Sequence, residues 1–157
     1  MLRLSKKADY ALIAMKHLAR QRPDAHSTSA REIAEQYDIP FELLAKVLQG
    51  LVRTGLLVST QGTRGGYALS RAPASISVAD IIQAIDGPLT VTACSTEKND
   101  CEQYSKCSIR DPLWQIRERI VAALVDVTLS EMAADTVATA PVAVVRPGRR
   151  NADEAFR

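Results

Sequence analysis

The sequence predicts a mainly α-helical fold with one small β-hairpin and a long helix near its carboxyl end. Three observations lead to this prediction. Apolar residues recur at helical spacing in several segments that begin with a capping residue. Two short strand-like runs flank a glycine-rich loop, and a long amphipathic segment follows a polar stretch that holds all three cysteines. With 157 residues, the chain can form one domain with a substantial core.

The first predicted helix runs from about Ser5 to Arg20. Its apolar residues recur every three or four positions, and they are Leu4, Ala8, Ala11, Leu12, Met15, Leu18 and Ala19. Pro23 ends this helix, and residues 23–28 are expected to form a loop.

Two shorter helices are predicted next. Ser29 opens the first, because Glu32 follows three residues later as in a capping box. Pro40 suits the first turn of the second, and Gly55 stands where its C-cap belongs. The residues expected to face the core are Ala30, Ile33, Ala34 and Tyr37 in the first helix and Phe41, Leu44, Leu48 and Leu51 in the second. Two short helices joined by a tight turn indicate a helix-turn-helix.

A β-hairpin is predicted directly after these helices. Residues 56–60 and 67–70 form its strands, and the glycine-containing residues 61–66 form its loop, with Arg64 near the tip. A hairpin in this place turns a helix-turn-helix into a winged helix. The loop does not fit a phosphate-binding P-loop, because no helix follows the glycines and a Lys-Ser/Thr ending is missing.

Two further helices complete the pattern. Ser77 and Asp80 cap the first, its apolar residues are Val78, Ile81, Ile82 and Ile85, and residues 86–88 end it. The second runs from residues 111–112 to about Leu129. Its apolar residues cover about half of the circumference, whereas one core contact needs about a third. We therefore expect this helix to pack on a second copy of the chain as well, although deeper burial within one chain would also explain the pattern.

Charge is distributed unevenly along the chain. Residues 1–71 hold 11 Lys or Arg against 6 Asp or Glu, whereas residues 72–133 hold 5 against 9. A basic first half favours nucleic acid as a partner, and a solvated basic face is the alternative. The start of the chain has no signal-peptide pattern and no apolar run could span a membrane, so a reducing, cytoplasmic location without membrane contact is expected.

The three cysteines, Cys94, Cys101 and Cys107, lie in one polar segment. Six residues separate the first pair and five the second, so the tight pair of a zinc knuckle is missing. Wider spacing favours an iron–sulfur cluster, either 2Fe–2S or 4Fe–4S. A metal-free thiol/disulfide switch and a zinc site stay open as alternatives. We expect no enzymatic activity, because no histidine lies near a cysteine in the sequence to activate it.

The order of these features, together with the segments 4–11 (LSKKADYA) and 62–67 (GTRGGY), resembles the IscR/NsrR family of bacterial winged-helix, cluster-binding regulators. The resemblance covers residues 1–132, and the ending 126–132 is most similar to the branch that represses sulfur-mobilisation (SUF) operons. It implies three parts: a winged helix-turn-helix DNA-binding domain (1–88), a cluster-binding loop (89–110) and a dimerisation helix (111–132). Residues 133–157 lie outside the resemblance, and their composition, rich in Ala, Val and Pro and then polar, predicts a flexible tail.

The chain departs from this family at two places. The first cysteine interval is one residue longer than expected, and Arg110 stands where an IscR-like protein has a ligating histidine. Arginine stays protonated and cannot ligate a metal. NsrR-like members imply a carboxylate from the first helix of the partner subunit, a position matched here by Asp9, which could instead be a surface carboxylate or a partner for Lys6 or Lys7. Local candidates are Glu97, Asp100 and Glu102.

The expected function is a dimeric repressor whose affinity for a double-stranded DNA operator follows the state of the cluster, with iron–sulfur assembly or stress genes as targets. The alternative is a regulator that works as a metal-free thiol/disulfide switch. The residues expected to contact DNA are Pro40, Phe41, Glu42, Lys46, Gln49 and Arg53 at the second helix of the helix-turn-helix and Thr63 and Arg64 in the wing.

Overall fold

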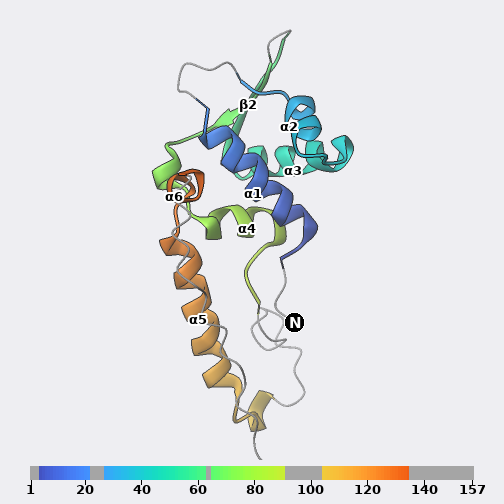
Figure 1. Cartoon of the computed structure of the whole chain (residues 1–157). Helices are drawn as coiled ribbons and strands as arrows, with labels where there is room; N and C mark the ends of the chain where they lie inside the picture. Colours follow the sequence, from blue (N-terminus) through green and yellow to red (C-terminus); the bar gives the residue numbers. More distant parts are fainter. Residues whose placement is uncertain (1–3, 22–26, 63–64, 91–103, 135–157) are drawn as a thin grey trace, which may run out of the picture.

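The computed structural model describes residues 4–21, 27–62, 65–90 and 104–134, and it confirms a mainly helical fold with one two-stranded antiparallel hairpin (Figure 1). The elements follow the predicted order. They are α1 (Lys6–Ala19), α2 (Ala30–Gln36), α3 (Phe41–Arg53), β1 (Leu57–Thr60), β2 (Gly66–Leu69), the 3-10 turn η1 (Pro73–Ser75), α4 (Val78–Asp86), the 3-10 turn η3 (Tyr104–Lys106), α5 (Arg110–Asp126) and α6 (Leu129–Ala133).

Local sequence signals fix where most helices begin and end. Ser29 and Ser77 each accept a hydrogen bond from the backbone of a residue three positions on, and the carboxylates of Glu32 and Asp80 accept bonds in return. Ser5 caps α1 in the same way without the reciprocal carboxylate. Gly87, at the end of α4, has a φ of 78°, a left-handed conformation that favours glycine. The predicted starts of α1, α2 and α4 are therefore confirmed.

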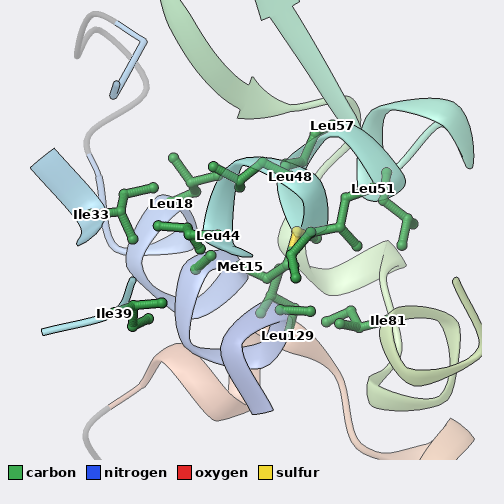
Figure 2. Close-up of a cluster of buried hydrophobic side chains, with 14 of the residues drawn as sticks. Met15, Leu18, Ile33, Ile39, Leu44, Leu48, Leu51, Leu57, Ile81 and Leu129 are labelled. Carbon is green, nitrogen blue, oxygen red and sulfur yellow. The ribbon is translucent and has the colours of Figure 1, made fainter. Parts of the chain in front are cut away.

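One hydrophobic core joins α1, α2, α3, α4, α6 and the hairpin (Figure 2). Its largest fully buried side chains are Met15, Ile33, Leu44, Leu48, Leu51, Leu57, Ile76, Ile81 and Leu129. Two residues expected to face it do not. Tyr37 is 38% exposed because it caps the end of α2, where the chain leaves the helix. Phe41 is 48% exposed because it begins α3 at the edge of the core and lies against Arg31 instead.

The hairpin is anchored to the segment before α2. Leu57 pairs with Leu69 as predicted, and Thr60 pairs with Gly66, which was expected in the loop. Thr28, expected in a loop, forms an additional antiparallel bridge with Tyr67, whose backbone N–H donates to the Thr28 carbonyl at 2.8 Å. This bridge brings the Thr28 carbonyl so close to Gly66 that any Cβ there would collide with it. Packing against Thr28 therefore requires glycine at position 66.

The predicted long helix is shorter than expected, which corrects its boundary at Leu129. Helix α5 ends at Asp126, Val127 is extended, and Thr128 caps a separate short helix, α6. Two backbone hydrogen bonds stabilise this break. Val78 N–H donates to Val127 O (2.9 Å), and Leu129 N–H donates to Ile76 O (2.8 Å). They place Leu129 in the core with no exposed surface. Helix α6 thus belongs to the core, whereas α5 extends away from it (Figure 1).

Among the described helices, none combines the length and the apolar composition that a membrane span needs.

Candidate nucleic-acid interface and cysteine segment

The outer face of α3 presents polar side chains opposite the core. Leu44, Val47, Leu48 and Leu51 are buried beneath the helix, whereas Lys46 and Gln49 between them are exposed. The structure places all six residues predicted on this helix and at its start on the exposed surface, namely Pro40, Phe41, Glu42, Lys46, Gln49 and Arg53. The last four recur at helical spacing, so they form one row of donors, acceptors and charges.

A cation of α2, which the sequence pattern did not single out, lies against the start of α3. The Arg31 guanidinium lies over the Phe41 ring, 5.7 Å from its centroid, and both side chains are exposed. Nine residues separate them in the sequence and no local motif links them, so only the packing of α2 against α3 reveals the pair. A shallow hollow beside them is lined by Arg31, Ala34, Glu35, Asp38, Ile39 and Phe41.

The hairpin lies beside the carboxyl end of α3. The predicted wing-tip residues Thr63 and Arg64 lie outside the described residues. At the base of the hairpin, Gln49, Val52, Arg53, Ser59 and Tyr67 surround a second hollow of about 380 Å³. The polar row of α3 and the hairpin therefore adjoin, as in a winged helix.

Only one of the three cysteines lies in the described part of the chain. Cys107 is a free, partly buried thiol between η3 and α5, whereas Cys94, Cys101 and the local candidates Glu97, Asp100 and Glu102 lie outside it. Arg110 begins α5, and its Nε donates to Asp111 Oδ1 at 2.7 Å. This bond lowers the pKa of Asp111 and engages the guanidinium with a carboxylate.

Asp9 lies in the first turn of α1 and is partly exposed. Within the described ranges its carboxylate has no ion pair or side-chain hydrogen bond, so the pairing with Lys6 or Lys7 is not formed there. The start of α1 is tied to the end of α4, because Ser5 Oγ donates to Asp86 Oδ1 at 2.6 Å. Asp9 therefore stands, unpaired, on a helix end that is fixed to the residues leading into the cysteine segment.

The residues that precede the cysteine segment are also held by α5. Arg117 Nε donates to the Leu89 carbonyl at 2.8 Å, and its guanidinium lies 5.1 Å from the centre of the Trp114 ring. Figure 1 shows η3, next to Cys107, beyond the end of α5 that is far from α1. The first turn of α1, which holds Asp9, and the start of α5, which follows Cys107, thus lie apart in one chain. No three potential metal-binding side chains gather within the described residues. A thiolate and a free carboxylate suit an iron site chemically if two chains bring them together.

Known proteins share this architecture. The family described as Rrf2, iron-dependent transcriptional regulator, matches residues 4–135. The HTH-type transcriptional regulator IscR of Escherichia coli is 31% identical over 132 residues, covering 83% of this chain and 80% of the relative. Among solved structures, CymR, the global cysteine regulator of B. subtilis, matches with a TM-score of 0.67 and 29% identity over 85% of this chain and 97% of that one. IscR of T. potens matches with a TM-score of 0.65 and 29% identity, covering 83% and 85%.

Proposed function

The chain belongs to the Rrf2 family of iron-dependent transcriptional regulators, and on that basis we propose that it is a dimeric repressor that senses iron–sulfur status, oxidants or nitric oxide through its three cysteines. Its targets on this proposal are genes for iron–sulfur assembly or stress. The observation that carries the proposal is the exposed polar row of α3 beside a hairpin, in a chain whose cysteines all follow that domain.

On the DNA side, we propose that α3 enters the major groove. Lys46, Gln49 and Arg53 would then meet bases or phosphates, and Glu42 would accept a hydrogen bond from a cytosine amine. Pro40 and Phe41 would lie at the groove edge, and Thr63 and Arg64 would reach the adjacent minor groove, where arginine is favoured. Replacing Arg64 by alanine should weaken operator binding by about 1–3 kcal/mol and reduce the salt dependence. Equal binding by both proteins across a salt titration would refute this role.

On the sensing side, we propose that Cys94, Cys101 and Cys107 hold an iron–sulfur cluster and that Asp9 of the partner subunit completes its ligand set. The unpaired carboxylate of Asp9 and the free thiol of Cys107 support this assignment. Thiolate-ligated iron is open to oxidation and to loss when it lies in a polar loop, and this is the chemistry that the cluster would supply.

The contacts around Asp9 suggest how such a signal would reach DNA. Ser5 links the start of α1 to the end of α4, and α1 shares the core with α3. Release of Asp9 would free the start of α1 in the partner chain and change the spacing of the two α3 helices. Dimeric helix-turn-helix proteins read half-sites about one helical turn apart, so a shift of a few ångströms should weaken binding.

The first test is a UV–visible spectrum of the protein purified without oxygen, with iron and sulfide assayed in the same sample. Broad visible absorption with matching iron and sulfide is the expected result. A colourless protein that takes up no iron on anaerobic reconstitution would contradict the cluster. If dithiol reductant then reversed its response to oxidant, the metal-free thiol switch would take its place.

The second test replaces Asp9 by alanine. We expect the bound cluster to become shorter-lived in air and its spectrum to change, because one ligand is lost. Glu35→Ala is the matched control, since it removes an exposed carboxylate from α2. A cluster with the same spectrum and lifetime in Asp9→Ala as in the control would remove Asp9 from the ligand set.

A further inference from the structure

The hollow between α3 and the hairpin is bordered by side chains from both elements. Gln49, Val52 and Arg53 come from the last turns of α3, and Ser59 and Tyr67 come from β1 and β2. Ser59 and Tyr67 are partners in the hairpin register, so their side chains emerge on the same face. Leu57 precedes Ser59 by two residues on that face and is 2% exposed. The hollow therefore begins where the strand leaves the core.

The polar groups around this hollow are not engaged within the protein. In the described ranges, the guanidinium of Arg53 has no carboxylate or hydrogen-bond partner, and the same holds for the side chains of Gln49 and Ser59. By contrast, Arg71 is paired with Asp80 at 3.1 Å and Arg117 with Glu118 at 2.6 Å. The residues around this space of about 380 Å³ thus carry one cation, one amide and two hydroxyls, those of Ser59 and Tyr67. Donors without internal acceptors suit a ligand that carries negative oxygens.

The placement of the hollow indicates which anion it takes. If α3 lies in the major groove and the hairpin reaches the adjacent minor groove, a single sugar–phosphate strand separates the two elements. That strand must pass over the junction of α3 with the hairpin. We propose, on the basis of the function proposed above, that this hollow binds one phosphate of that strand, with Arg53 and Ser59 as its donors. Ser59 thereby becomes a DNA-contacting residue that the sequence pattern did not identify.

Replacing Arg53 and Ser59 separately should distinguish the contribution of charge to DNA binding from the contribution of hydrogen bonding. Arg53→Ala should weaken binding to an operator duplex by on the order of tenfold and lower the salt slope by about 1. Ser59→Ala should weaken binding by on the order of tenfold with an unchanged slope, because a neutral donor to a charged acceptor is lost. Matched controls are Arg71→Ala, which removes an arginine paired elsewhere, and Ser130→Ala, which removes an exposed serine of α6. Both controls should bind like the wild type.

A second measurement tests the contact from the DNA side. The operator is first selected from random duplexes with the full-length protein, and single phosphates are then replaced by neutral methylphosphonates. One replacement between the two contacted grooves should weaken wild-type binding by on the order of tenfold and have little further effect on Arg53→Ala or Ser59→Ala, because the interaction is already lost.

The possible failures are distinguishable. If the wild type binds DNA specifically but both variants bind like their controls, the phosphate site is wrong and the proposed function stands. The phosphate site is equally wrong if every methylphosphonate weakens the variants as much as the wild type. If the wild type binds no duplex selectively, the proposed function and this inference both fall.

Discussion

The helical body, formed by α1–α4, the hairpin and α6, differs sharply from α5 in how it buries apolar side chains. The body contains nine large side chains without significant exposed surface, whereas none of the residues of α5 is buried. On α5, Trp114, Ile116 and Val125 are 48%, 47% and 50% exposed. In proteins, most of the stability of a helix comes from tertiary packing of its apolar face. The body can therefore fold on its own contacts, whereas we expect α5 to require a second chain.

The largest effect is expected from a substitution in the centre of the body. Leu48 is fully buried in α3, so Leu48→Ala should lower the free energy of unfolding by about 2–5 kcal/mol. Urea denaturation followed by circular dichroism measures this change. Lys46→Ala, on the exposed side of the same helix, should stay within about 0.5 kcal/mol of the wild type. If both variants lowered the free energy of unfolding equally, the assignment of Leu48 to the buried face of α3 and of Lys46 to its exposed face would be wrong.

The next effect concerns the exposed apolar face of α5. Ile116→Asp places a charge on that face, so it should weaken the dimer by about 2 kcal/mol or more, roughly a thirtyfold rise in dissociation constant. Sedimentation equilibrium at several concentrations measures it. Gln115→Asp adds the same charge to the polar side of α5 and should leave the dimer intact. If Ile116→Asp dissociates no more than this control, or if the wild type is itself monomeric at micromolar concentration, α5 is not the interface.

A smaller effect on stability is expected at Thr128, which lies between α5 and α6. Thr128 accepts a hydrogen bond from the Glu131 backbone at 3.2 Å, and its own N–H donates to the Glu131 carboxylate at 2.8 Å. Thr128→Ala should cost about 1 kcal/mol of stability, because the cap of α6 is lost. Thr128→Ser keeps the hydroxyl and should recover most of it in the same denaturation assay. If serine and alanine were equally destabilising, the cap would not be the reason.

Local signals account for the part of the fold that was predictable. Ser29 with Glu32 and Ser77 with Asp80 start helices because each pair satisfies backbone groups within four residues of chain. The break after Asp126 was missed because apolar spacing continues to Leu129, and bonds to Ile76 and Val78 decide it. The bridge between Thr28 and Tyr67 is likewise non-local.

The candidate site likewise contains residues that the sequence predicted and residues that it did not. Spacing along one helix predicted the exposed row of α3, because a single helical face suffices to define it. Ser59 and Arg31 were missed because each acquires its neighbours through packing of separate elements. The cluster assignment depends on Cys94 and Cys101 and on a second chain, so it stays a prediction.

The smallest effect is expected at a group of polar side chains that connects α1, α2 and the hairpin. His17 Nδ1 lies 3.3 Å from the Tyr37 hydroxyl, and its Nε2 lies 3.2 Å from the Gln21 amide nitrogen. Gln21 also donates to Thr28, which bridges to the hairpin. Because the amide nitrogen donates, Nε2 of His17 must accept and the ring must be neutral. This contact links α1 to the end of α2 and to the base of the hairpin.

Burial is the main cause that lowers the pKa of His17 from its usual value of 6.5; Glu32 opposes the shift and Arg20 adds to it. Between the lowered pKa and 6.5 the unfolded chain binds more protons than the folded chain, so stability should fall as the pH drops through this window. His17→Gln cannot titrate and keeps polar atoms at the site. Melting temperatures measured from pH 7.5 to 5 should therefore decline less steeply in His17→Gln than in the wild type. Parallel declines would show that the proton on His17 does not affect the joint between α1, α2 and the hairpin.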